Sequence, residues 1–210
     1  MDDSEIAALI ADLDHHDKPT IRAAVDALLP LAEQSPALRA LLHERLTRSG
    51  QQNYWPVAYV LGQLPSPSHA VVQTLLDALA HREPDIRWAV ALLLIRIAKQ
   101  NVKLVSRLID LSATGTANQK RMALYCIRDL VLSDAASLAA SVNALSDVDP
   151  TVRVAAAICL KPRADLKDDG RNLLLRLVSE EFSAGLDAAS RSDDPQMKKA
   201  ALAALSLLQK

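Results

Sequence analysis

The sequence predicts an all-α fold, an α-solenoid in which about six antiparallel helix pairs form a right-handed superhelix. The first observation behind this prediction is a repeated motif, in which a proline is followed three residues later by Arg or Lys and then by an Ala-rich apolar run. It reads "DPTVRVAAAICL" at 149–160 and recurs at 18–29, 83–94 and 194–205. The second is the spacing of the copies, and the third is a composition of five Gly with abundant Ala and Leu, which favours helix over sheet.

The spacing is that of a repeat protein. Arg22 and Arg87, the basic residues of two copies, are 65 residues apart, and Arg153 follows Arg87 by 66, each about twice 33. Weaker copies lie midway, with Arg121 in "NQKRMALYCIRDL" (118–130) and Pro56 in "NYWPVAYVLGQL" (53–64). Self-similarity at this period is the signature of a solenoid, in which each helix pair buries its two apolar flanks against its neighbours.

A single repeat domain over 1–210 is therefore expected. Only the interval from Arg153 to Lys198, 45 residues, is long, because "KPRADLKDDG" (161–170) reads as a polar insertion. The expected repeats are approximately 3–34, 35–66, 67–99, 100–132, 133–163 and 164–210.

The first three repeats each read as two helices. In the first, "DHHD" (14–17) is a polar turn before the second helix. The second repeat has Pro56 in place of the basic residue, so its second helix must begin near Pro56 or be kinked there. In the third, one helix over 68–82 ends at "HREP", and Pro84 suits the first turn of the next.

The later repeats follow the same plan. Asp149 and Asp194 stand directly before proline, where an N-cap residue belongs. Two residues after each basic residue the chain carries alanine, which lets neighbouring helices approach closely. These alanines are Ala24, Ala89, Ala123, Ala155 and Ala200.

The pattern D-P-x-V-R-x-x-A resembles HEAT repeats, specifically the short bacterial type seen in phycobilin lyase-like HEAT proteins, over residues 3–209. The resemblance implies that the first helix of each pair lines the convex side and the second the concave side. It also implies a ladder in which the basic residues pair with carboxylates of neighbouring turns. The ladder would comprise Arg22, Arg87, Arg121, Arg153 and Lys198, with Asp17, Asp85, Asp147 or Asp149 as partners. The alternative is a positive stripe that binds an acidic ligand.

The few large aromatic side chains are the candidate binding residues. Only 3% of the chain is aromatic, and five of its six aromatics fall on the second helices of repeats two to four. Tyr and Trp are enriched at binding hot spots, although packing between Ala-rich repeats would also use them. The predicted binding set is Trp55, Tyr59, Trp88, Met122 and Tyr125, with Arg87 and Arg121 beside them.

No catalytic, metal or cofactor site is expected. The adjacent residues of "DHHD" rarely converge on one ion. Cys126 and Cys159 lie in apolar helical runs and read as core residues, without a His beside them that would activate a thiolate. No phosphate-binding glycine loop, nucleophile elbow or zinc-protease motif is present in the sequence.

These features favour a non-enzymatic scaffold or adaptor that binds a protein or peptide on its concave face. The resemblance implies an alternative, a bilin lyase-like accessory protein acting on a tetrapyrrole-bearing subunit. HEAT-like nucleic-acid binding is a third alternative, against which the net charge of −1 argues. The acidic N-terminus and the absence of an apolar stretch of about 18 residues favour a cytoplasmic location. A homodimer formed through the last repeat is also considered.

Overall fold

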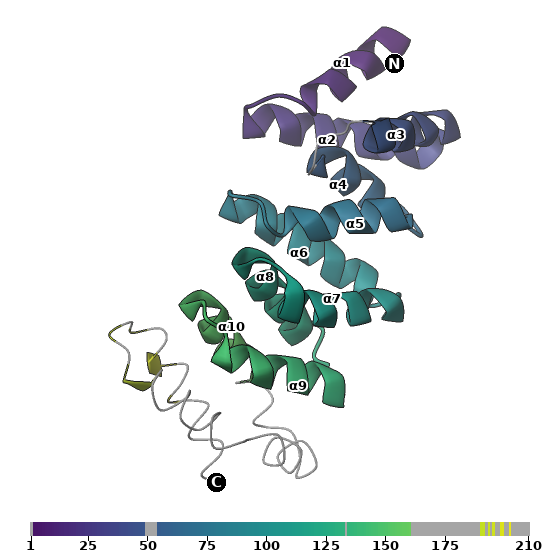
Figure 1. The fold of residues 1–210 in the computed structure, drawn as a ribbon. Coiled ribbons are helices and arrows are strands. Elements are labelled where there is room, and N and C mark those ends of the chain that lie inside the picture. Colours follow the sequence, from purple (N-terminus) through teal and green to yellow (C-terminus); the bar gives the residue numbers. More distant parts are fainter. Residues whose placement is uncertain are drawn as a thin grey trace. The chain divides into compact units, whose positions relative to one another are not determined.

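The computed structural model describes residues 2–48, 54–132 and 134–160, together with single positions between 190 and 202. Within these residues the chain forms ten α-helices and one 3-10 turn, and no strand (Figure 1). The all-α prediction is thus confirmed. Most of the predicted sixth repeat, including Asp194 and Ala200, lies outside the described residues, and Lys198 is an exposed single position.

The chain divides into two compact units, and the division falls inside one helix. The N-terminal unit is Met1–Leu94 and the C-terminal unit is Ile95–Lys210. The shared helix, α6, covers Pro84–Ala98. The prediction of one continuous repeat domain stays a prediction.

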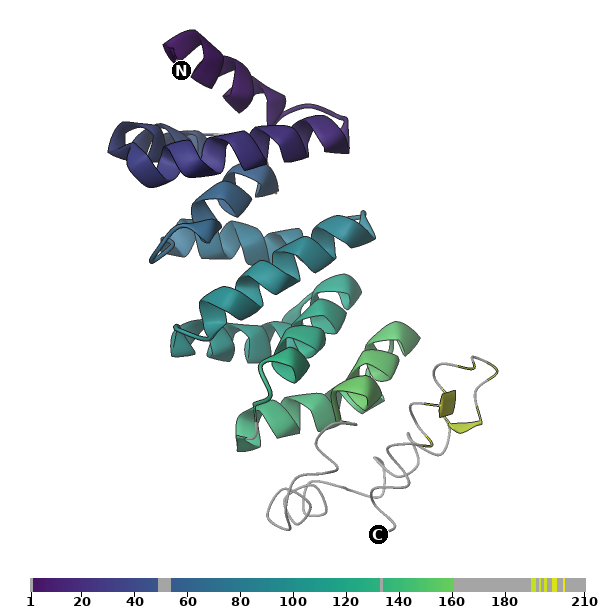
Figure 2. The ribbon, with the colours of Figure 1, turned by 180° about the vertical axis from the view of Figure 1, so that it is seen from behind.

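In the N-terminal unit, helices pair with their chain neighbours and stack on the next pair. Helix α2 packs against α1, α3 and α4, and α4 also packs against α3 and α5. In Figure 2 the second helices of the pairs, α2, α4 and α6, lie on the side turned toward the viewer, with α3 and α5 behind them. The bounds are α1 Asp3–Asp12, α2 Lys18–Gln34, α3 Pro36–Arg48, α4 Trp55–Gln63 and α5 His69–Ala78.

The C-terminal unit uses the same arrangement. Helix α8 packs against α7 and α10, while α9 packs against α7 and α10. The bounds are α7 Val102–Thr114, α8 Ala117–Asp129, α9 Ala135–Asn143, the 3-10 turn Ala144–Ser146 and α10 Pro150–Leu160.

Side-chain caps explain where many of these helices begin. Asp17 accepts a hydrogen bond from the backbone N–H of Thr20 at the start of α2. Asp149 accepts from the N–H groups of Thr151 and Val152 at the start of α10, which confirms its prediction as an N-cap. These bonds satisfy donors that the first turn of a helix leaves without intrahelical partners.

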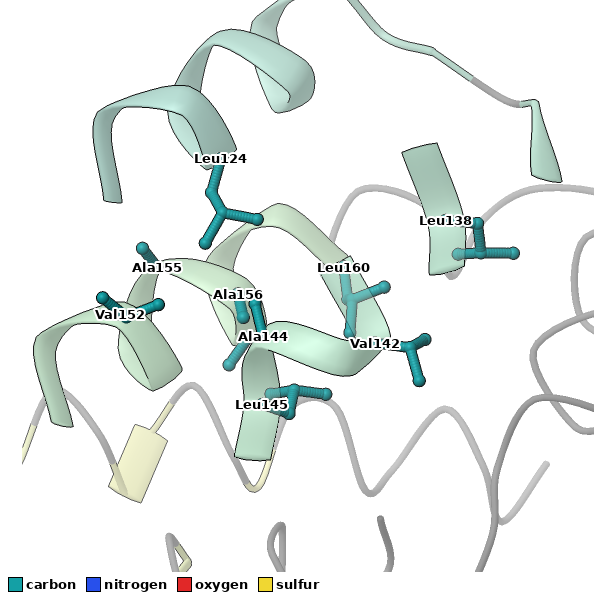
Figure 3. Packing of buried hydrophobic residues seen from close by; sticks show 10 residues of the cluster. Leu124, Leu138, Val142, Ala144, Leu145, Val152, Ala155, Ala156 and Leu160 are labelled. Atoms are coloured by element: carbon teal, nitrogen blue, oxygen red, sulfur yellow. The ribbon is translucent and has the colours of Figure 1, made fainter. Parts of the chain in front are cut away.

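In the C-terminal unit, the predicted small residues of α8 and α10 occupy buried positions. In the C-terminal unit, Leu124 of α8 contacts a cluster on α10 that includes Val152, Ala155 and Ala156 (Figure 3). Ala155 is fully buried, as is Ala123. A larger side chain at either position would therefore hold the two helices apart.

Both cysteines are buried in the helices of the C-terminal unit. Cys126 and Cys159 are fully buried, and the Ser141 hydroxyl lies 3.2 Å from the Cys159 sulfur. Burial raises the pKa of the Cys126 thiol to about 12, which leaves it neutral at physiological pH. Their prediction as core residues is confirmed.

Two basic residues of the repeat motif, Arg87 and Arg153, bind backbone carbonyls, which differs from the predicted ladder. Arg87 Nη1 donates to the carbonyl of His81 at 2.6 Å and to that of Arg82 at 2.9 Å. Arg153 Nη1 donates to the carbonyls of Asp147 at 2.7 Å and Val148 at 3.1 Å. A residue three positions after the helix-starting proline faces back over the preceding turn, so its guanidinium can satisfy carbonyls that no helix uses.

The other motif residues differ from one another. Arg22 is 85% exposed along its side chain and lies 3.9 Å from Asp26, one turn further along the same helix. Arg121 donates to the Asn118 side chain, and it also helps to lower the pKa of Asp149, after the hydrogen bonds from Thr151. The predicted partner carboxylates Asp85 and Asp147 are bound, but by the lysines Lys18 and Lys120.

Candidate functional site

Helix α4 lacks the first turn that the other second helices of the N-terminal unit have. Helix α2 begins at Lys18, four residues before its motif residue Arg22, and α6 begins three before Arg87. Helix α4 begins at Trp55, one residue before Pro56, and its N-cap residue makes no side-chain capping bond. The missing turn leaves space between the N-terminal ends of α2 and α6.

This space is a groove of about 710 Å³. Its size is in the range typical of ligand-binding clefts. Side chains from all three second helices form its walls and floor. It is lined by Lys18, Pro19, Ile21, Arg22, Val25 and Asp26 of α2, Trp55, Tyr59 and Gln63 of α4, and Asp85, Ile86 and Ala89 of α6.

A glycine lets α4 pack closely against its neighbours. A Cβ atom at Gly62 would lie 2.8 Å from Leu75 Cδ1 and 3.1 Å from Leu93 Cδ2. Both leucines are buried and held by the surrounding core. The absence of a side chain at this position therefore allows α4 to approach α5 and α6 closely.

Two aromatic rings line the groove along α4. Trp55 and Tyr59 are four residues apart, which places them on one helix face, and their rings meet edge to face with centroids 6.3 Å apart. Both are half-buried. The indole also meets the ring of His81 edge to face at 6.2 Å. The aromatic pair thus has one supported side and one side toward the groove.

His81 supports this end of the groove as a neutral ring. Its Nδ1 accepts a hydrogen bond from the backbone N–H of Glu83 at 3.1 Å, and its carbonyl is one of those that Arg87 binds. Burial lowers the pKa of His81, and the charges of Arg82 and Arg87 lower it further against the opposite effect of Glu83. The hydrogen bond from Glu83 to the His81 ring and the bond from Arg87 to the His81 carbonyl together hold the turn before α6.

A lysine joins α2 to this turn. Lys18 Nζ lies 2.8 Å from Glu83 Oε2 and 2.8 Å from Asp85 Oδ2, although α4 stands between α2 and α6 in chain order. The hydrogen bonds that Lys18 donates to the two carboxylates raise the pKa of Lys18 and lower the pKa of Glu83 and of Asp85. We call this group the Lys18 bridge.

The predicted binding residues fall in three different environments. Trp55 and Tyr59 line the groove. Trp88 is 40% exposed on α6, outside the groove lining. Arg87 is 8% exposed and binds backbone carbonyls, so its prediction as a surface binding residue is wrong.

The remaining predicted residues belong to the C-terminal unit. Met122 is 1% exposed and packs in the core, so it cannot be part of a binding surface. It follows the same apolar pattern as its neighbours, and sequence position alone did not reveal its orientation. Tyr125 is half-buried, with the guanidinium of Arg128 5.1 Å from the centre of its ring. Arg121 is half-buried beside Asn118.

Sequence reasoning missed most of the groove. Ile21, Val25, Ile86 and Lys18 line the groove but were not among the predicted binding residues. The signal that could have found the groove is the loss of the motif in the second repeat, where Pro56 replaces the basic residue and Trp55 and Tyr59 lie close by.

The described residues contain no cluster of three or more His, Cys, Asp or Glu side chains arranged to hold a metal ion. In "DHHD", His15 Nδ1 accepts from the backbone N–H of Asp17, and Asp17 caps α2. Both side chains thus serve the turn. Across the same described residues, no helix combines the length and apolar character that crossing a bilayer demands.

No protein-family model matches the chain, and no curated protein matches its sequence. Solved structures do match. A designed armadillo repeat protein in complex with the peptide (KR)4 has a TM-score of 0.55 and 14% identity, over 97% of this chain and 99% of that one. An engineered protein from the Northeast Structural Genomics Consortium has a TM-score of 0.54 and 19% identity, over 100% of this chain and 99% of that one.

Computationally designed armadillo repeat proteins for modular peptide recognition are a third match, with a TM-score of 0.53 and 14% identity over 96% of this chain and 99% of theirs. Identities this low establish the fold alone. The chain is a helical-repeat solenoid similar to designed armadillo repeat proteins.

Proposed function

We propose that the protein is a non-enzymatic scaffold that binds a protein or peptide in the groove between α2, α4 and α6. The observation that carries the proposal is the half-buried pair Trp55 and Tyr59 in an open groove lined by three helices. Aromatic side chains supported on one side and accessible on the other are typical of binding hot spots.

The structural neighbours support the same reading. One of them was solved with a peptide, and another was designed for modular peptide recognition. In this chain a comparable role would use the groove, because it joins apolar side chains such as Ile21, Val25 and Ile86 with a few polar groups. This mixture is typical of binding sites that take one segment of a partner.

Selection from a displayed peptide library tests the proposal, with the full chain as bait. The variant Ala89→Leu fills part of the groove lining without removing any core side chain, and it should reduce binding of the selected peptides at least tenfold. The matched pair Trp55→Ala and Trp88→Ala removes the same side chain inside and outside the groove lining. Only Trp55→Ala should reduce binding, with helical circular dichroism as the control for folding.

If Ala89→Leu and Trp55→Ala bind the selected peptides as the wild type does, the groove is not the binding site. A loss confined to Trp88→Ala would move the site to the exposed face of α6.

Three further features of the protein belong to the same proposal. The short HEAT type of the repeat, the cytoplasmic location and a homodimer through the last repeat rest on the sequence. No arrangement of the described residues favours the bilin lyase-like role or nucleic-acid binding, so neither is proposed here.

A further inference from the structure

The charged side chains that line the groove are balanced and bind one another. They are Lys18 and Arg22 on one hand and Asp26 and Asp85 on the other. Lys18 is held by Asp85 and Glu83, and Arg22 lies 3.9 Å from Asp26. A charged ligand would have to compete with these internal partners, whereas an uncharged ligand would not.

The uncharged polar groups of the groove are hydrogen-bond donors that have no hydrogen-bond partner among the described residues. Trp55, Tyr59 and Gln63 follow one another every four residues along α4, and in the described part of the chain their side chains make no hydrogen bond. The indole N–H only donates, and the phenol and the primary amide can both donate. The α4 side of the groove thus offers three donors in a row.

A ligand that suits these donors must present carbonyl groups that it does not use itself. A helical ligand uses its carbonyls in its own hydrogen bonds, and a β-strand needs an exposed sheet edge. A polyproline II segment has no internal hydrogen bonds, and its prolines supply carbonyls without N–H groups. The proline rings also pack well on aromatic side chains, and proline-rich segments bind other aromatic-lined grooves in this way.

We propose that the groove takes an uncharged, proline-rich segment of a partner protein in the polyproline II conformation. The inference rests on the proposed function and specifies the chemistry of the partner. In this arrangement Trp55 and Tyr59 contact the proline rings, and the indole, phenol and Gln63 amide donate to peptide carbonyls. The Lys18 bridge and the Arg22–Asp26 pair stay intact at the groove walls.

Fluorescence of Trp55 tests the proposal directly. The protein has two tryptophans, so the variant Trp88→Phe leaves Trp55 as the only indole reporter. The probe is a capped decaproline peptide, with a capped Gly-Ser peptide of equal length as the control. We expect a saturable change in emission with decaproline, with a Kd of about 1 mM or tighter, and none with the Gly-Ser peptide.

Two conservative variants, made in the Trp88→Phe background, separate the contribution of the hydrogen-bond donors from that of side-chain shape. Tyr59→Phe keeps the ring and removes the hydroxyl, and Gln63→Met keeps the length and removes the amide. Each should weaken decaproline binding about fivefold, the effect of one hydrogen bond. Binding should change less than twofold between 0.1 and 1 M NaCl, since the ligand is uncharged.

Charged probes distinguish failure of this inference from failure of the proposed function. If (Lys-Arg)4 or an octaglutamate peptide binds at Trp55 with strong salt dependence and decaproline does not, the groove binds peptides but the inference on partner chemistry is wrong. If substitutions at Trp55, Tyr59 and Gln63 alter the binding of no probe and no library peptide, the proposed function and the inference on partner chemistry are both wrong.

Discussion

The second helices of the two units use the same motif with different results. In the C-terminal unit, α8 and α10 meet across fully buried alanines, and the lysine of α8 binds the carboxylate of the next turn, with Lys120 Nζ 2.8 Å from Asp147 Oδ2. In the N-terminal unit, α4 is short, and Lys18, at the first position of α2, binds the turn before α6. One unit has a closed interface and the other a groove.

The comparison shows that a repeat protein can have a groove where one copy of its motif is incomplete. Helix α4 has no arginine like those of α6 and α10, which bind the backbone carbonyls of the preceding turn. It also lacks the first helical turn. The groove beside this helix is lined by Trp55 and Tyr59. The physical reason is that a solenoid depends on neighbour contacts, so a local defect leaves a gap without unfolding the stack.

The largest expected effect compares two alanines at the same motif position. Ala155→Leu inserts a side chain into the filled interface of α8 and α10 and should destabilise the protein by about 2 kcal/mol. Ala89→Leu faces the groove and should cost less than about 0.5 kcal/mol. Urea unfolding of both variants measures the difference. Equal losses would mean that the groove wall is as tightly packed as the core.

The next effect compares two motif arginines. Arg87→Ala removes a buried guanidinium that binds two carbonyls and should destabilise the protein by about 2 kcal/mol. Arg22→Ala removes a side chain that is 85% exposed, and its effect should stay within about 0.5 kcal/mol. Thermal unfolding under identical conditions compares the variants. A large effect of Arg22→Ala would show that the motif arginines act alike, against the structure.

A smaller effect concerns the ion pair of the C-terminal unit. Burial raises the pKa of Asp147, but the hydrogen bonds from Lys120 and from the backbone N–H of Asp149 outweigh it, so the pKa lies below its ordinary value. A carboxyl whose pKa is lowered by folding contributes stability above its unfolded pKa, near 4, and loses it as the pH falls through the folded value.

Asp147→Asn should therefore cost about 1 kcal/mol at pH 7 and have a smaller effect at pH 2, where the wild-type carboxyl is also neutral. Free energies of unfolding at the two pH values measure this difference. The same penalty at both pH values would show that the charge of Asp147 is not what stabilises the turn.

The smallest effect on stability belongs to the Lys18 bridge. Its three side chains are exposed to solvent, so Lys18→Gln should shift the unfolding midpoint slightly at low salt and not at all in 1 M NaCl. The Lys120→Gln variant, whose lysine is mostly buried, serves as the matched control and should keep most of its effect in 1 M NaCl. If the two variants lose their effects equally in salt, the proposed difference in burial between the two bridges has no energetic consequence.

Most of the fold could be predicted from the sequence, but only part of the candidate site. The helix-starting prolines, the N-cap at Asp149 and the buried alanines Ala24, Ala123 and Ala155 are local features, and each is present in the structure. The aromatics of α4 stood out because aromatics are scarce. By contrast, Met122 and Arg87 occupy positions that look exposed in sequence and are buried in the structure.

The sequence by itself determined that the chain is helical, where the second helices of the motif begin, and which residues carry the repeat, because these depend on contacts within one helical turn or between adjacent copies. The tertiary structure decided which lysine reaches which carboxylate, that the arginines bind carbonyls, and that α4 leaves a groove. The lysine bridges and the groove depend on distances between separate helices, and the arginine bonds depend on how each guanidinium folds back over the preceding turn; the periodicity of a sequence contains neither.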